Sequence, residues 1–175
     1  MNDVMRNERV SQSDALHAGL IAGVIAGLAM AMVSMMMAMM TGEGFWAPVK
    51  KISVTLLSQS AVQEPGFQFI PVLVGMMIHF ATAIAFGIIF ALLALLSRGR
   101  SYGATVGVGI AYGLAIWVVM QFLVLPVVNP VMAQMPPLQF AMLHVIFGGT
   151  LGSYPAFLPS VKKSQTQGMR ASRVA

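Results

Sequence analysis

The chain has 175 residues, of which 58% are hydrophobic and 9% carry a charge, and its mean hydropathy is +0.82. Soluble domains carry about 25% charged residues, so this composition leaves too little polar surface for a water-soluble globule. The absence of cysteine excludes disulfides, thiolate zinc sites, iron–sulfur ligation and cysteine nucleophiles. The length fits one compact domain.

The net charge of +5 is distributed over short clusters that flank long apolar runs. Clusters of this kind are typical of topology signals and of contact with anionic lipid. They do not form the single basic patch that a nucleic acid would need. We therefore expect the lipid bilayer as a partner and no nucleic acid.

A polar cytoplasmic tail, residues 1–14, precedes the first predicted span at about residues 17–40. That apolar stretch exceeds the roughly 20 residues that a helix needs to cross a bilayer core of about 30 Å. In the connection that follows, Phe45 and Trp46 are expected at the membrane interface, where aromatic rings are favoured. A short amphipathic helix around Ile52 is expected to lie in the same interface.

The second predicted span covers about residues 70–96 and is followed by a tight basic turn. Sixty residues without a charge come next, from 101 to 160, which is too long for one span. Prolines and polar residues in the middle of this stretch predict a turn between a third span, at about 102–125, and a fourth, at about 138–158. A basic tail, residues 161–175, completes the chain. The prolines are Pro126, Pro130, Pro136 and Pro137.

Orientation follows from the distribution of lysine and arginine. The N-terminal tail and the turn near residue 98 hold two each and the C-terminal tail holds four, whereas the opposite side has only Lys50 and Lys51. Because basic residues concentrate on the cytoplasmic side, both termini of the 15–160 membrane domain are predicted there. This predicts a multi-pass protein of the bacterial inner membrane.

Small residues recur at four-residue spacing in every predicted span. Lipid is as apolar as leucine, so close approach of backbones at small residues is what holds membrane helices together. The pattern predicts an all-α, four-helix transmembrane bundle, with a homo-oligomer or another membrane protein as a possible further partner. The residues expected to pack are Gly19, Gly23, Gly27, Gly75, Gly87, Gly148 and Gly152, with Gly103, Gly107, Gly109 and Gly113 in the third span.

Two segments hint at an internal duplication. Residues 79–87 align with residues 144–152, each beginning with histidine and ending with glycine, and residues 23–33 align with 109–119. Two tandem helical hairpins of equal orientation would be related by an axis along the membrane normal.

Sequence features that carry chemistry are few. The predicted spans hold no Asp, Glu, Lys or Arg, which disfavours ion-coupled transport. No catalytic triad, phosphate loop or metalloprotease motif is present, so we expect no enzyme, and the sequence identifies no cofactor or metal. The unusual residues are His79, His144, Gln121 and Met36, which are predicted to form a polar layer, or a ligand site, in the outer half of the bundle.

Three roles for the histidines stay open. His79 and His144 can hydrogen-bond between helices and fix their packing. Two imidazoles at matching depth can also ligate haem b. A third alternative is a copper site, because thioethers prefer Cu(I) and Met32, Met36 and Met40 recur every four residues.

The order of these features resembles a known family. A glycine-rich first helix leads to Gly44-Phe-Trp-Ala-Pro48, followed by Gly75-Met-Met-Ile-His79-Phe and by His144 near the start of the fourth helix. This order resembles small bacterial inner-membrane proteins of the YagU type. The resemblance implies a bacterial inner-membrane protein and assigns no substrate and no site residues.

The functional expectation is therefore a structural or accessory membrane protein, or an envelope-stress factor. The alternatives are a haem- or copper-binding redox or metal-handling protein that uses His79 and His144, and a small channel or transporter.

Overall fold

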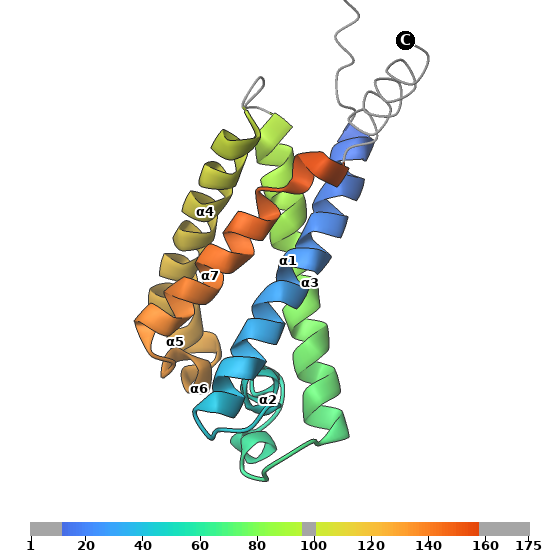
Figure 1. The fold of residues 1–175 in the computed structure, drawn as a ribbon. Coiled ribbons are helices and arrows are strands. Elements are labelled where there is room, and N and C mark those ends of the chain that lie inside the picture. Colours follow the sequence, from blue (N-terminus) through green and yellow to red (C-terminus); the bar gives the residue numbers. More distant parts are fainter. Residues whose placement is uncertain (1–11, 96–100, 158–175) are drawn as a thin grey trace, which may run out of the picture.

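A computed structural model describes residues 12–95 and 101–157, and in this part of the chain the protein is all-α, as predicted (Figure 1). Short helices connect the longer ones. The longer elements are α1 (Gln12–Met40), α3 (Phe69–Leu95), α4 (Tyr102–Val119) and α7 (Pro137–Leu151). The shorter elements are α2 (Ala47–Ser53), η1 (Gln59–Val62), η2 (Met120–Val124), α5 (Leu125–Val128), α6 (Pro130–Ala133) and η3 (Tyr154–Phe157).

Three helical stretches are long and apolar enough to cross a membrane, by length and composition. They are α1, α3 and the continuous run from Tyr102 to Val128, and they fit a multi-pass membrane protein. The fourth predicted span, at about 138–158, corresponds to α7, which has 15 residues. At 1.5 Å per residue α7 is about 22 Å long, and η3 follows it closely in the chain.

The third helix continues past the predicted end at residue 125. Proline lacks an N–H and its ring clashes with the carbonyl four residues earlier, so Pro126 was expected to stop the helix. Instead, the wider π-turn of η2 comes directly before it, and the Leu125 N–H donates to Met120 O. A π-bulge of this kind lets a helix bend and continue.

The helices form two closely packed pairs, α1 with α3 and α4 with α7, and α1 also packs against α7. Figure 1 shows the start of α1, the end of α3 and the start of α4 at one end of the bundle. At the other end, α2 packs on α3, and α5 and α6 lie beside α2 (Figure 1).

Glycine allows backbone contact within each pair. A Cβ atom at Gly23 of α1 would lie 2.7 Å from Ala83 O of α3, closer than real Cβ atoms come. In the other pair, a Cβ atom at Gly109 of α4 would clash with Gly148 O of α7. These contacts occupy equivalent places in the segments aligned above, so the two pairs are alike at their closest approach.

The remaining glycines of the predicted packing faces divide into three groups. Gly19, Gly27, Gly87, Gly113 and Gly152 also lie at these two interfaces, whereas Gly75 lies against Val49 of α2. Gly103 and Gly107 differ from the expectation, because a Cβ atom at either would meet nothing within 4 Å. This face of α4 packs against no other described part of the chain.

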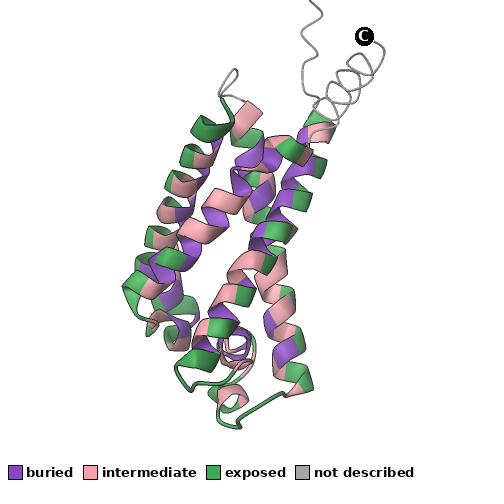
Figure 2. Cartoon of the chain, in the orientation of Figure 1, coloured by how far each residue is buried: buried purple, intermediate pink, exposed green. Residues whose placement is uncertain are grey.

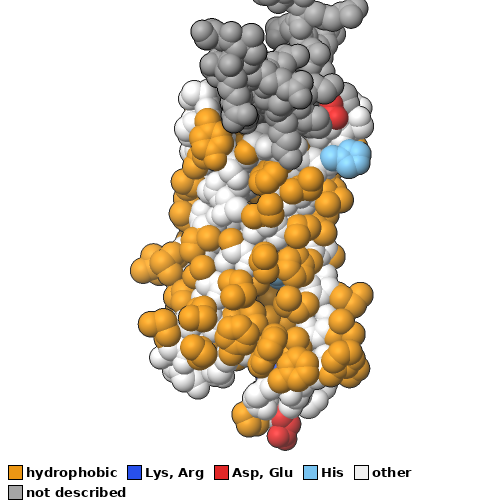
Figure 3. Space-filling view, turned by 45° about the vertical axis from the view of Figure 1, so that its right-hand side comes forward, with side chains coloured by type: hydrophobic (Ala, Val, Ile, Leu, Met, Phe, Trp, Pro, Cys, Tyr) orange, Lys and Arg blue, Asp and Glu red, His pale blue; other side chains and the backbone are white. Residues whose placement is uncertain are grey.

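The outer surface is predominantly apolar. Buried residues lie on the helix faces that are turned toward neighbouring helices (Figure 2), while large hydrophobic side chains such as Leu28 and Met77 are exposed, at 49% and 64%. Figure 3 shows hydrophobic side chains along most of the length of one face. Lipid, unlike water, solvates such a surface without cost.

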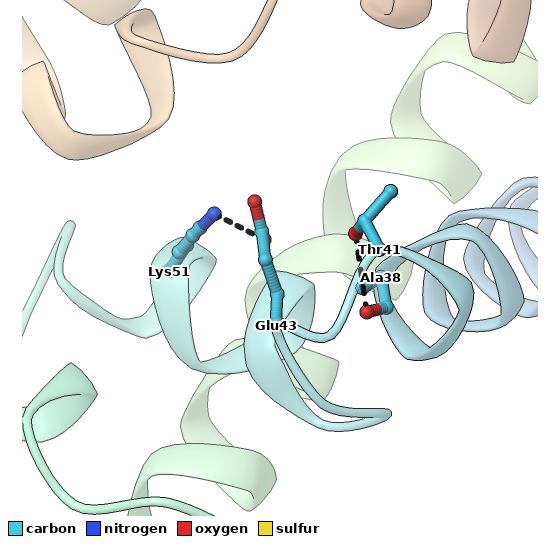
Figure 4. Close-up of polar contacts among 4 residues, drawn as sticks. All are labelled: Ala38, Thr41, Glu43 and Lys51. Atoms are coloured by element: carbon cyan, nitrogen blue, oxygen red, sulfur yellow. Dashed lines mark hydrogen bonds and ion pairs between the residues drawn. The ribbon is translucent and has the colours of Figure 1, made fainter.

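The described ion pair lies in the connection after α1, away from the apolar surface. Lys51 Nζ lies 2.6 Å from Glu43 Oε2, and Thr41 Oγ1 donates to Ala38 O at 3.2 Å to close the end of α1 (Figure 4). Both charged side chains are partly exposed, so the pair contributes at most about 1 kcal/mol. Its neighbour Lys50 is buried and donates to Glu64 O, which ties α2 to the end of this connection.

Candidate functional site

A partly open cavity of about 380 Å³ lies between the two helix pairs. It is lined by α1 and α3 on one side and by α4 and α7 on the other. Residues of α2, η2, α5 and α6 line the part nearest the end of the bundle where α2 packs. Most of the lining is apolar, and both His79 and His144 belong to it.

His79 occupies the middle of α3 and reaches across to α1. Its Nε2 lies 2.9 Å from Gly27 O, and because a carbonyl oxygen only accepts, the ring nitrogen is the donor. A Cβ atom at Gly27 would lie 2.8 Å from Ala83 Cβ, so the glycine lets α1 and α3 approach closely where this hydrogen bond forms. His79 therefore forms a hydrogen bond between helices of the kind expected for a packing role.

His144 has a different arrangement, although it aligns with His79 in the sequence. Its Nδ1 donates to Phe140 O, 2.9 Å away and one turn earlier in α7, and its ring packs edge-on against the Phe140 ring. The side chain is buried, at 5% exposure. It makes no hydrogen bond to another helix among the described residues, so the packing role does not account for it.

Gln121 and Met36 do not join the histidines. Gln121 is buried in η2, where its Nε2 donates to Ala133 O at 3.0 Å and its Oε1 has no partner in the described part of the chain. Its side chain does not line the cavity. Met36 is 44% exposed on the outside of α1. Of the four residues predicted to form one layer, the two histidines line the cavity, and Gln121 and Met36 do not.

The methionines of the cavity are not those of the sequence pattern. Met32 and Met40 of the predicted four-residue repeat are, like Met36, exposed on the outer surface. The methionines that line the cavity come from four separate segments and include only one from the cluster around Met36. They are Met30, Met35, Met120, Met132 and Met135.

Asn129, which the sequence placed only in a turn, proves to be a buried connector at 1% exposure. Its Nδ2 donates to Lys51 O and to Thr55 Oγ1, both at 2.9 Å, at the end of α2. Its Oδ1 accepts from Met132 N at 3.0 Å and caps α6. It therefore fastens α2, from the first half of the chain, to α6 in the second half. The available sequence signal was an asparagine directly before a proline, a pattern typical of a helix N-cap.

One side of the cavity lies between α3 and α4, which pack less closely than the other neighbouring helices. Near the end with the 96–100 connection they are bridged by Tyr112, whose hydroxyl donates to Phe86 O at 3.1 Å and whose ring packs on Phe90. Farther along, the two helices separate (Figure 1), and Ile78 and Thr82 of α3 face Ile116 and Met120 of α4 and η2 across the cavity.

The charge of the cavity limits what it can hold. Its described lining contains no Asp, Glu, Lys or Arg. An isolated ion buried in such surroundings is strongly destabilised, so both imidazoles are neutral there. Each ring has one nitrogen engaged with a backbone carbonyl and one nitrogen left to accept a hydrogen bond or to ligate a metal. No group of three or more His, Cys, Asp or Glu residues forms a metal site in the described ranges.

Comparison with known proteins adds no assignment. No family model, curated protein or solved structure matches this chain. The likeness to YagU-type proteins therefore stays a prediction.

Proposed function

We propose that this protein is a non-enzymatic, four-span accessory protein of the bacterial inner membrane that binds an apolar small molecule in the cavity between its two helix pairs. The observation that carries the proposal is the cavity of about 380 Å³, which both histidines line. Small-molecule sites are typically mostly apolar clefts of about 300–1,000 Å³ with a few polar groups that fix orientation. This cavity has that size and that character.

The four-span topology is supported by where the helices begin and end. The start of α1, the end of α3 and the end of α7 share one end of the bundle (Figure 1), and η3, which follows α7, packs against α1. An even number of crossings produces this arrangement. In this proposal α7 is the fourth span, and η3 extends it toward the cytoplasm. The excess of lysine and arginine in the three predicted cytoplasmic segments supports a cytoplasmic position for that end.

Single-cysteine labelling tests this topology without a background, because the chain has no cysteine of its own. Ser60→Cys, in η1, is expected to react with a membrane-impermeant maleimide added to intact spheroplasts. Ser101→Cys, at the other end of the bundle, is expected to react only after the membrane is permeabilised. The opposite pattern would reverse the orientation, and labelling of both in intact spheroplasts would rule out the four-span arrangement.

Ligand binding in the cavity is tested with bromobenzene, an apolar probe whose bromine quenches tryptophan fluorescence. Trp46 and Trp117 each pack against residues that line the cavity, so they report on its occupant. We expect saturable quenching for the wild-type protein in vesicles. Ser34→Phe, which places a ring in the cavity from α1, is expected to abolish the saturable part.

The matched control is Met36→Phe, two residues along the same helix but 44% exposed on its outer face. It adds an aromatic ring without filling the cavity, so saturable quenching is expected to survive. Linear, non-saturating quenching that is the same in all three proteins would show simple partition into lipid and would refute the binding function.

A further inference from the structure

The hydrogen bonds of the two histidines indicate which kind of ligand group they can bind. His79 Nε2 and His144 Nδ1 both carry their hydrogen, because each donates to a carbonyl oxygen. In a neutral imidazole the second nitrogen is then an acceptor with a lone pair. These nitrogens, His79 Nδ1 and His144 Nε2, receive no hydrogen bond from any described residue.

The other polar side chains of the lining do not change the preference of the histidines for a ligand that donates a hydrogen bond. Thr82 Oγ1 already donates to Ile78 O at 2.8 Å, and all of the hydrogen bonds of Asn129 Nδ2 go to α2 and Thr55. The hydroxyls of Ser34 and Thr55 can donate or accept, and they therefore adapt to a ligand oxygen. The histidines, in contrast, can only accept, so a ligand that they bind must donate a hydrogen bond to them.

The charge and the aromatic lining of the cavity narrow the class of ligand further. With no carboxylate in the described lining, a cationic ligand would be uncompensated, and with no Lys or Arg an anionic headgroup would be too. Phe86, Phe140 and Phe147 contribute aromatic rings, against which a flat ring packs favourably. A neutral ring that carries a hydroxyl group meets all of these conditions.

The geometry points to a neutral, membrane-soluble ligand of the phenol or hydroquinone class, held with its hydroxyl donating to His79 or His144. This inference rests on the proposed function, since it specifies what the same cavity binds. The ring of the ligand would lie among the lining phenylalanines and methionines.

A matched pair of probes separates the donor from the ring. Para-bromophenol and para-bromoanisole have the same brominated ring, but only the phenol can donate a hydrogen bond. In the full-length protein in vesicles, we expect the phenol to quench tryptophan with a dissociation constant roughly threefold to tenfold lower than the anisole, after correction for partition into lipid. That ratio is the usual net contribution of one hydrogen bond.

Substitution of the histidines identifies the acceptor. His144→Leu is expected to bring the phenol to the level of the anisole while leaving the anisole unchanged, and His144→Gln, which restores an acceptor oxygen, is expected to recover part of the preference. If His144→Leu retains the full preference, the same comparison with His79→Leu assigns the bond to His79. Thermal unfolding of each variant shows whether it remains folded.

Two outcomes would overturn the inference, and they are distinct from failure of the proposed function. Equal saturable binding of phenol and anisole would leave an apolar ligand site but remove the donor preference. Stoichiometric binding of Cu(I) that displaces the phenol would instead make the imidazoles and the five lining methionines metal ligands, since soft cations favour thioethers. If neither probe saturates, the proposed function itself fails.

Discussion

Gly148→Ala is expected to lower the free energy of unfolding by about 2–3 kcal/mol. A Cβ atom there would clash with Gly109 O and would lie 3.1 Å from Gly113 Cα. Because the obstacles are backbone atoms, no side-chain rotation can relieve the contact, and α4 and α7 must move apart. Reversible unfolding of the purified protein in mild detergent measures the change.

Gly107→Ala is the matched control for this substitution. It makes the same chemical change on α4, but a Cβ atom at Gly107 meets nothing within 4 Å. Alanine is the better helix former by up to about 1 kcal/mol, so this variant is expected to be at least as stable as the wild type. Equal destabilisation of both variants would mean that Gly148 matters for reasons other than the α4–α7 contact. A loss confined to Gly107→Ala would indicate that its open face is covered by a partner.

Asn129→Leu is expected to destabilise the protein by about 3 kcal/mol. The substitution removes the donor to Lys51 O and Thr55 Oγ1 and the acceptor for Met132 N, and each buried polar group left without a partner costs about 1–3 kcal/mol. It also separates α2 from α6, so protease sensitivity of the connection between α1 and α3 is expected to rise. Unfolding in detergent and limited proteolysis test the two effects.

Asn129→Asp separates the two roles of this residue, the bonds that Nδ2 donates to Lys51 O and Thr55 Oγ1 and the cap that Oδ1 makes on α6. Aspartate keeps the acceptor that caps α6, but it places a carboxylate against Lys51 O, so loss of the α2 contact alone should be seen. Gln134→Leu is the control for removing an amide nearby, because Gln134 is exposed and its side chain makes no hydrogen bond among the described residues. If Asn129→Leu and Gln134→Leu have the same small effect, the clamp between the two halves does not stabilise the fold.

Composition and residue spacing were enough to predict the class of fold and much of its local structure. The low charge and long apolar runs predicted an all-α chain, and prolines marked the region between the third and fourth helices. Four-residue spacing of glycine pointed to the faces on which helices meet, because only small residues allow backbones to approach closely in lipid. The aligned histidines pointed to one layer, and the structure places both on one cavity.

Which side chains face that cavity depends on how the helices pack. In a soluble protein, the alternation of apolar and polar residues reveals the inner face of a helix. Here both faces are apolar, since lipid and protein interior make the same demand, so Met36 could not be told from Met35 by pattern. Only the packed structure turns Met36 outward and Met35 inward.

The connector role of Asn129 and the different bonds of His79 and His144 were hidden from the sequence for a related reason. Each depends on a backbone carbonyl, and a carbonyl is present at every residue, so nothing in the sequence indicates which one a side chain will meet. Gly27 O lies within reach of His79 because α1 and α3 touch there, whereas His144 bonds within its own helix. The sequence thus determined which residues could form a site, and the packing of the helix pairs determined what each of them does.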